Sequence, residues 1–237
     1  MNVSVIIPTF NKWNLTVSRL MELSHYCSDI YEVVLIDDAS TEPFTQLSLW
    51  EERSPWKLQY SRNKMNFGFG LSMNLGASLA TGDVFVFLSN DVEVKKDFVP
   101  EIRRQIDMHD CPILMGAEVL TRNTGWNTID DLVVPYPHGW FIACHRDVWE
   151  VLGGFDYETY GLSDFDDIDL GLTAIDNNIM LVQLENQSLR HLVARSFGYN
   201  PERLARTKSN QKKFIQKWRS RIDVGGLSAK VRSITGG

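Results

Sequence analysis

The sequence has no apolar run of about 18 residues, only three cysteines and no glycine-rich phosphate loop. The first absence means that no transmembrane helix is expected. Cys27, Cys111 and Cys144 are widely spaced and odd in number, which argues against a disulfide framework and for reduced thiols in a cytosolic setting. An apolar strand pattern begins at Val3, so no signal peptide is expected ahead of it.

Further missing patterns exclude several kinds of site. A Rossmann dinucleotide site needs G-x-G-x-x-G after the first strand, but this chain has Pro8-Thr9-Phe10-Asn11 there. An EF-hand starting at Asp164 would need glycine at its sixth position and glutamate at its twelfth, where Asp169 and Ile175 stand. The net charge of −6 gives no reason to expect nucleic acid as the main partner. Because 43% of the residues are hydrophobic, the composition predicts a globular domain with a substantial core.

The first 91 residues alternate between short apolar runs and stretches of helical periodicity. Apolar runs bounded by polar residues predict buried strands, and apolar residues three or four apart predict amphipathic helices. This alternation predicts an α/β fold, with a Rossmann-like, mostly parallel central sheet flanked by helices in a single domain. Strands are expected over residues 3–7, 32–36, 56–61 and 85–88, and helices over 15–27, 45–52 and 71–80.

The pattern after residue 91 is less regular. Residues 121–131 are rich in Asn, Thr, Gly and Asp and predict a mobile loop. Helices are expected over residues 98–108, 146–152 and 170–177, and strands over 112–117, 140–144 and 180–184.

Residues 201–222 turn basic and carry an apolar stripe of Phe214, Ile215 and Trp218, which predicts an amphipathic C-terminal helix. Three interpretations of this helix remain open. It packs on the domain with its charges in water, it contacts anionic lipid or a phosphate-bearing acceptor, or it docks into a larger assembly. Residues 223–237 are expected to form a flexible tail.

Three acidic clusters follow expected strands. In open α/β sheets the ligand lies beyond the carboxyl ends of the strands, so these clusters are candidate ligand sites. Gathered carboxylates repel one another unless a cation compensates, and Mg²⁺ or Mn²⁺ prefers such oxygen ligands and bridges phosphates. A solvated acidic loop remains the alternative. The clusters are Asp37 with Asp38, Ser89 and Asn90 with Asp91, and Asp166 with Asp167 and Asp169; His191 could add a nitrogen ligand, which slightly favours Mn²⁺.

Six motifs in order closely resemble the family 2 glycosyltransferases of GT-A fold, particularly their bacterial and viral rhamnosyltransferase-like members. Each motif alone is weak, but their order over residues 3–198 is specific. The motifs are residues 3–11 (VSVIIPTFN), 35–41 (LIDDAST), 66–76 (NFGFGLSMNLG), 81–91 (TGDVFVFLSND), 153–156 (GGFD) and 166–170 (DDIDL).

The resemblance implies a metal-dependent, inverting transfer of a sugar from a nucleotide-diphosphate donor, with UDP or dTDP favoured. It implies a donor half over residues 1–91 and an acceptor half over residues 92–200. Asp91 corresponds to the last residue of the D-x-D motif and would hold Mn²⁺ or Mg²⁺. Asp167 corresponds to the general base, with Asp166 and Asp169 beside it as groups that could raise its pKa. Donor-binding residues are expected at Pro8, Thr9, Phe10, Asn11, Asp37, Asp38, Asn66, Gly68, Asn74, Ser89 and Asn90.

Within this set the resemblance implies distinct roles. Thr9 and Phe10 line the nucleoside pocket, and Asp38 contacts the base with help from Asp37. His191, in His191-x4-Ser196, matches a histidine near the diphosphate and the metal. Two departures stand out, because Ser89 occupies the first D-x-D position and Asp166 stands where relatives usually have Glu.

Acceptor and activity remain open at this stage. The acceptor could be a surface polysaccharide, a lipid-linked sugar or another glycan, with Trp126, His138 and Trp140 as candidate lining residues. Two other functions are weighed: a catalytically degenerate nucleotide-sugar or glycan binding module, which Ser89 permits, and a nucleotidyltransferase, which would want a basic residue or a glycine-rich loop after the first strand. A cytoplasmic protein with possible peripheral membrane contact is expected.

Overall fold

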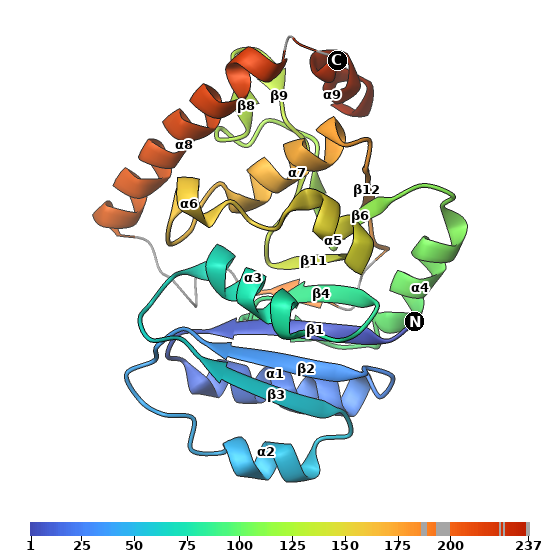
Figure 1. Cartoon of the computed structure of the whole chain (residues 1–237), viewed down its shortest axis with the longest axis vertical. Helices are drawn as coiled ribbons and strands as arrows, with labels where there is room; N and C mark the ends of the chain where they lie inside the picture. The colour runs from blue at the N-terminus through green and yellow to red at the C-terminus, as the bar shows by residue number, and fades with distance from the viewer. Residues whose placement is uncertain (186–188, 193–199, 223, 225, 236–237) are drawn as a thin grey trace.

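The computed structural model describes residues 1–185, 189–192, 200–222, 224 and 226–235, and its centre is a seven-stranded sheet (Figure 1). The strand order is β12-β6-β11-β4-β1-β2-β3. Within this sheet β11 runs antiparallel to both of its neighbours, and the other neighbouring pairs are parallel. The strands are β1 (Val3–Thr9), β2 (Glu32–Asp37), β3 (Lys57–Arg62), β4 (Val84–Leu88), β6 (Ile113–Gly116), β11 (Phe141–His145) and β12 (Met180–Gln183).

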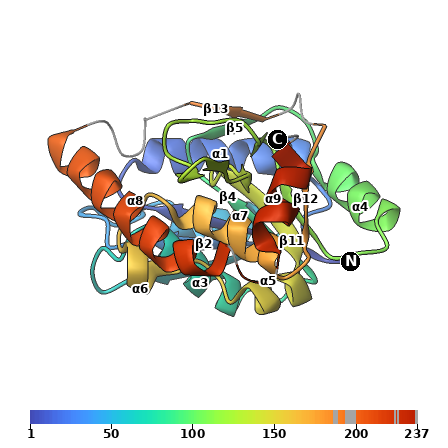
Figure 2. The ribbon, with the colours of Figure 1, turned by 90° about the horizontal axis from the view of Figure 1, so that it is seen from above.

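Helices cover both faces of the sheet because its central strands are apolar on both sides. Val5 and Ile7 of β1 belong to the same buried cluster as Leu20 of α1 and Ile102 of α4. Ile6 points the other way, into a second cluster with α3, α5 and α7. Figure 2 shows α1 on one side of the sheet and α3 and α5 on the other. The helices are α1 (Trp13–Tyr26), α2 (Leu47–Arg53), α3 (Phe69–Leu79), α4 (Val99–Met108), α5 (Arg146–Leu152), α6 (Tyr157–Tyr160) and α7 (Asp166–Asp176).

The strand order reverses between β1 and β4. The chain adds β2 and β3 on one side of β1 and then returns to place β4 on the other side. In open α/β sheets a ligand binds at such a reversal, beyond the carboxyl ends of the strands. Thr9 ends β1, Asp37 ends β2 and Leu88 ends β4, so the polar residues that follow these strands gather at one edge of the sheet.

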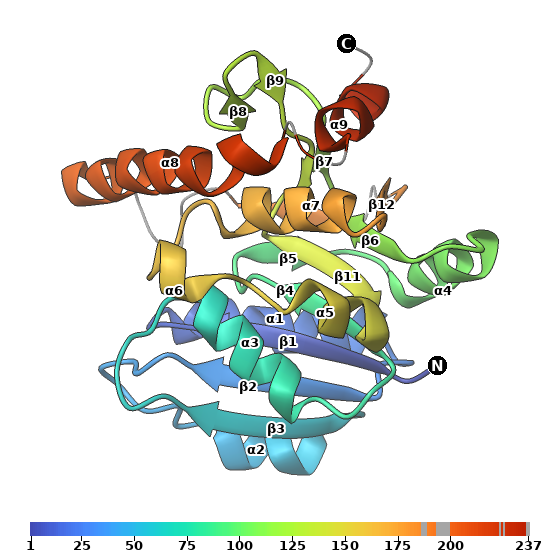
Figure 3. The same ribbon diagram turned by 45° about the horizontal axis from the view of Figure 1, so that its top comes forward.

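A third buried cluster joins the two C-terminal helices, α8 (Pro201–Ile222) and α9 (Leu227–Thr235), to the rest of the domain. Phe214 and Trp218 of α8 and Val231 of α9 are almost fully buried in it. Figure 3 shows α8 crossing above α6 and below the β8–β9 hairpin, formed by β8 (Thr128–Ile129) and β9 (Leu132–Val133). Beside this hairpin, β7 (Val119–Leu120) pairs with β10 (Tyr136–Pro137). The C-terminal helices are therefore part of the domain's core.

Two sequence expectations need correction, and one pair of strands beside the site was not expected. Residues 227–235 form a helix, where a flexible tail was expected, because Leu227 and Val231 find an apolar cluster to bury in. Residues 121–131 were expected to be a mobile loop, but they include β8 and are held by the buried side chain of Asn127. The pair of β5 (Val92–Val94) and β13 (Leu189–His191) was missed, because both strands are only three residues long. Among the described residues, no helix is long and apolar enough to span a bilayer.

Trp218→Ala tests whether α8 belongs to the core. The indole is about 1% exposed and its Nε1 donates a hydrogen bond to Asp169, so truncation leaves a cavity and removes one of the donors to that buried carboxylate. We expect a loss of about 3–5 kcal/mol in the free energy of unfolding, measured by urea denaturation. Lys212→Ala on the exposed side of the same helix is the control and should change stability by less than about 0.5 kcal/mol. Equal stability of both variants would contradict the assignment of α8 to the core.

Candidate active site

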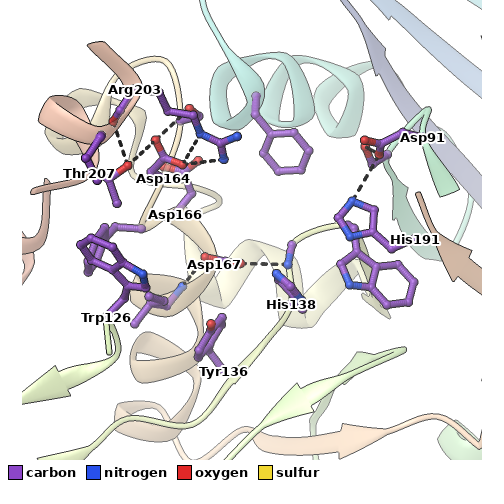
Figure 4. A pocket seen from close by; sticks show the side chains of 18 of the residues that line it. Asp91, Trp126, Tyr136, His138, Asp164, Asp166, Asp167, His191, Arg203 and Thr207 are labelled. Carbon is purple, nitrogen blue, oxygen red and sulfur yellow. Dashed lines mark hydrogen bonds and ion pairs between the residues drawn. The ribbon is translucent and has the colours of Figure 1, made fainter. Parts of the chain in front are cut away.

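One large cleft, of about 710 Å³, opens at the carboxyl edge of the sheet beside β4 and α7 (Figure 4). Among the residues expected in a site, it brings together Asp91, Asp166, Asp167 and His191, with Ser89 at its margin. These residues are up to 102 positions apart in the sequence, and the fold places them in a single cavity. The cleft lining is mainly apolar, with aromatic side chains on several sides, which is typical of a ligand site with a few polar groups placed for chemistry.

Asp91 and His191 form the end of the cleft nearest β4. The β5–β13 pairing aligns His191 with Val92, so the imidazole comes next to the preceding aspartate, and its Nε2 lies 3.5 Å from Asp91 Oδ1. The hydroxyl of Ser89 donates to the same Oδ1 at 2.6 Å. Ser89, at the first D-x-D position, therefore holds the Asp91 carboxylate in place, although Ser89 itself carries no charge. The indole of Trp140 stacks on the His191 ring, with centroids 5.5 Å apart.

This end fits a divalent cation that is completed by a ligand's phosphates. A nearly buried carboxylate beside an imidazole provides one hard oxygen ligand and one nitrogen ligand. No group of three His, Cys, Asp or Glu side chains suited to a metal occurs in the described part of the chain. Mg²⁺ and Mn²⁺ sites that act on phosphates commonly use only one or two protein carboxylates, with waters and phosphate oxygens supplying the rest. Ser196, the last residue of the expected histidine motif, lies outside the described residues.

Asp167 lies in the middle of the cleft, in the first turn of α7. Its Oδ2 accepts a hydrogen bond from the backbone N–H of Gly139 at 2.9 Å, and its Oδ1 accepts one from its neighbour Ile168 at 2.9 Å. A Cβ at position 139 would lie only 3.2 Å from Oδ2, so a glycine permits this close approach. Burial raises the pKa of Asp167, while the nearby imidazole of His138 and the two N–H donors act in the opposite direction.

Asp166 is more deeply buried than Asp167. Its Oδ1 has no hydrogen-bond partner among the described residues. Burial raises the pKa of Asp166 far above its usual range, and the carboxylates of Asp167 and Asp164 add to this shift. We expected like-charge repulsion to raise the pKa of Asp167, but the largest cause there is burial. Two adjacent carboxyl groups thus have different environments: one is hydrogen-bonded at the cleft surface, and the other favours a neutral form.

The loop that leads into α7 has a strained backbone. Asp164 and Phe165 adopt φ values of 75° and 81°, which cost non-glycine residues on the order of 1–3 kcal/mol each. Helix α8 holds this conformation. The amide nitrogen of Asn210 lies 2.9–3.1 Å from the carbonyl oxygens of Tyr160, Ser163 and Asp164.

Arg203 and Thr207 of α8 also bind the side chain of Asp164, at 2.9 and 3.2 Å. Several residues that line the cleft were not expected from the sequence, because they come from segments that are distant in the chain and meet only in the folded protein. These residues are Phe69, Tyr136, Gly139, Asp164, Arg203 and Thr207.

A smaller pocket, of about 40 Å³, adjoins the cleft at the ends of β1, β2 and β4 and shares Phe69 and Ser89 with it. Asp38 shapes it: Oδ1 accepts from the backbone N–H of Phe67 and Oδ2 from that of Gly68, both at 2.8 Å. Gly68 has φ 87°, and any Cβ there would clash with the Leu162 carbonyl. The expected donor-binding residues that line this pocket are Pro8, Thr9, Phe10, Asp38, Asn66, Gly68, Ser89 and Asn90.

Two further expected donor-binding residues, Asn11 and Asp37, lie at the same edge of the sheet but line neither pocket. The side-chain oxygen of Asn11 accepts two hydrogen bonds from Thr41. Asp37 is fully buried and bound by Tyr60 and Arg62, each at 2.9 Å. These contacts brace the loops around the small pocket.

Asn74 and Asp169 are also outside both pockets. Asn74 pairs with both backbone groups of Phe155 and so ties α3 to the loop before α6. Asp169 faces α8, where it accepts hydrogen bonds from Trp218 Nε1 at 2.7 Å and Lys217 Nζ at 2.8 Å. Asp169 therefore acts as a packing anchor in the structure, although the sequence placed it beside the base.

Most of the basic side chains of α8 are used within the chain. Burial would lower the pKa of Lys217, but Asp169 and Asp156 outweigh it and raise that pKa. Arg219 pairs with Asp130, and Arg221 contacts Asp176 at 2.6 Å. Most of the positive charge of α8 is therefore explained by contacts within the domain, as expected for a helix that packs on it.

A family model described as "Glycosyl transferase family 2" matches residues 4–139, which is more than half of the chain. TarS of Staphylococcus aureus, a poly(ribitol-phosphate) β-N-acetylglucosaminyltransferase, is 28% identical over 118 residues, or 48% of this chain and 20% of that protein. The first four curated relatives are matched over only 13% to 29% of their own lengths. This chain therefore spans less than a third of each of them.

Solved structures share the fold over nearly the whole chain. The structure of TarS 1–349 with UDP has a TM-score of 0.65 and 18% identity, and covers 99% of this chain and 70% of that one. The structure of GalNAc-T7 with UDP, GalNAc and Mn²⁺ has a TM-score of 0.73 and 15% identity, and covers 100% of this chain and 54% of that one. The structure of the mannosyltransferase PcManGT of Pyrobaculum calidifontis, with GDP-Man and Mn²⁺, has a TM-score of 0.63 and 16% identity. It covers 99% of this chain and 75% of that one. At these identities the likeness shows the GT-A fold.

The burial of Asp166 gives a prediction that does not depend on activity. A carboxyl group whose pKa is raised on folding stabilises the native state at low pH, and that contribution is lost as the pH rises above its unfolded value of about 3.9. Asp166→Asn resembles the neutral acid and should raise the free energy of unfolding at pH 7, by about 1.4 kcal/mol for each pH unit between the unfolded pKa and the native pKa or pH 7, whichever is lower.

The gain should shrink toward pH 4 in urea titrations performed with EDTA. The exposed Asp131→Asn is the matched control and should show no such trend. A loss of stability in Asp166→Asn at pH 7 would show that the ionised carboxylate is the favoured form.

Proposed function

The chain belongs to glycosyl transferase family 2, and we propose that it transfers a sugar from a nucleoside-diphosphate donor to a hydroxyl group of a glycan or lipid-linked acceptor, with inversion. The observation that carries this proposal is the composition of the large cleft. A carboxylate with a raised pKa, Asp167, shares it with a carboxylate–imidazole pair suited to a metal, Asp91 and His191. A second, small pocket of expected nucleoside-binding residues opens beside it.

The donor would lie across the boundary between the two pockets. Its nucleoside would lie over the small pocket, which admits only an edge of the base, with Thr9, Phe10 and Asp38 around it. Its diphosphate would reach Asp91 and His191 past Ser89, which lines both pockets. This placement matches the general rule that ligands of open α/β sheets bind at the strand-order reversal, here between β1 and β4.

Transfer would then take one displacement. Asp167 removes the proton of the acceptor hydroxyl while that oxygen forms a bond to the anomeric carbon. The bond from the anomeric carbon to the diphosphate oxygen breaks on the opposite face, and the nucleoside diphosphate leaves with the electron pair. Asp91 and His191 would hold Mn²⁺ or Mg²⁺, which neutralises charge on the leaving diphosphate. The raised pKa of Asp167 makes its carboxylate a stronger base toward that proton than an ordinary exposed carboxylate.

UDP and dTDP are the donor nucleotides we favour; structures of fold neighbours contain UDP, UDP-GlcNAc and GDP-Man. Their Mn²⁺ complexes support a divalent metal. We further propose that the protein acts in the cytoplasm, where nucleotide sugars are the donors, and that any membrane contact is peripheral. Exposed side chains such as Lys208 and Lys212 of α8 are the candidates for such contact.

Ligand-dependent stability tests the donor site. We expect UDP or dTDP with Mn²⁺, at ~100 times its dissociation constant, to raise stability by roughly 2.7 kcal/mol, seen as an increase in Tm. Asp91→Asn should remove the metal-dependent part of the shift, and Asp107→Asn, exposed on α4, should keep it. A shift with GDP alone would overturn our choice of nucleotide. The absence of any shift with UDP, dTDP or GDP would contradict the proposed donor site.

The base is tested by Asp167→Asn. We expect kcat for transfer to fall by about 10²–10⁴-fold, because general base catalysis contributes that much, while the donor still raises Tm. In the wild type, kcat should decline as the pH falls through the raised pKa of Asp167, because only the ionised form accepts a proton. Asp147→Asn, exposed on α5, is the control. Full transfer activity in Asp167→Asn, together with loss of activity in Asp166→Asn, would show that Asp166 is the base.

A further inference from the structure

The cleft continues well beyond the metal end, on the far side of Asp167. Figure 4 shows Trp126 on one side of Asp167, and Asp91 with His191 on the other. The indole of Trp126 is half-exposed and lines the cleft together with Tyr136, Leu204 and the buried ring of Phe165. A donor held by Asp91 and the small pocket would leave this aromatic part of the cleft for the acceptor.

The segment that carries Trp126 is held in place. Asn127 is fully buried, and its side chain accepts from the Thr124 N–H at 2.9 Å and donates to the Val134 carbonyl at 2.8 Å. Gln211 of α8 lies 3.5 Å from the carbonyl of Trp126. A side chain on a backbone segment that is already fixed before binding has less conformational entropy to lose when a ligand stacks on it. Trp126 therefore has the properties of a platform for a ring.

The charges around this part of the cleft restrict what the ring can carry. Asp164, Asp166 and Asp167 are three carboxyl groups on one wall. The guanidinium of Arg203 is 2.9 Å from Asp164 and compensates that side chain. Because Asp166 favours its neutral form, the charge that a ligand meets beside Trp126 is mainly that of Asp167, which must be ionised to act as a base. A phosphate placed next to it would meet a like charge in a mainly apolar cleft, and this repulsion acts against binding.

We infer that the acceptor is an uncharged sugar ring of a glycan, which stacks on Trp126 and presents its hydroxyl to Asp167, and that a phosphate-bearing polyol is disfavoured. This inference rests on the proposed function and adds the acceptor class to it. It also distinguishes the chain from TarS, whose name assigns it a poly(ribitol-phosphate) acceptor.

Kinetics with defined acceptors test the inference. The probes are methyl glycosides of glucose, galactose, mannose, rhamnose and N-acetylglucosamine on one side, and ribitol 5-phosphate and glycerol 3-phosphate on the other. We expect transfer to neutral glycosides, and an acceptor KM about tenfold higher in Trp126→Ala, a typical value for losing one aromatic contact. Trp126→Phe should restore most of the acceptor affinity that Trp126→Ala loses. The donor KM should change less than twofold in both variants. Tyr31→Ala, an exposed aromatic outside the cleft, is the matched control.

A binding experiment covers the case in which none of these probes is turned over. The protein is labelled with 5-fluorotryptophan, and the ¹⁹F signal missing from Trp126→Phe identifies residue 126. Neutral glycosides at 50 mM should shift this signal, and the phosphates should not. A preferred phosphate acceptor, a shift with phosphates alone, or no shift with either class would overturn the inference. Failure of the donor function itself would appear separately, as no Tm shift with any nucleotide.

Discussion

Buried carboxylates at the start of α7 are the constraint on which the rest of this structure depends. Asp166 and Asp169 are nearly inaccessible to water, so each carboxyl group must be neutral or have its charge compensated. Burial raises the pKa of Asp166, which therefore favours the neutral form. Asp169 is compensated by α8, which brings Lys217 and Trp218 to its carboxylate, and the amino-terminal end of α7 also favours negative charge.

The same helix shapes the entrance to the cleft. Asn210 and Arg203 of α8 hold a loop whose backbone is left-handed at Asp164 and Phe165. Such a conformation persists only where the surroundings over-determine it, and strained residues of this kind cluster at functional sites. The helix thus links the stability of the C-terminal core to the position of the carboxyl group that we assign as the base. Its basic character, which suggested a membrane or a phosphate, mainly serves this internal role.

The two ends of the cleft divide the chemistry. At one end, short strands of three residues bring His191 to Asp91, and Ser89 orients the shared carboxylate. At the other, Trp126 lines the cleft together with three carboxyl groups. Asp167 lies between the two ends, where a donor and an acceptor would meet. One sheet edge thus brings the residues that we propose for metal binding, for the base and for ring stacking into a single cavity.

The sequence by itself determined the βα alternation, the mostly parallel sheet and the polar clusters at strand ends, because apolar periodicity and strand-end polarity are local patterns. It also indicated most of the residues around the small pocket, together with Asp91, Asp167 and His191. Only the tertiary structure decided that Asp169 anchors a helix and that Asp164 and Arg203 line the cleft. It alone showed that residues 227–235 form a helix in the core. Those outcomes depend on contacts between segments that are distant in sequence and on which side chains are buried against one another. Local sequence patterns encode neither of these.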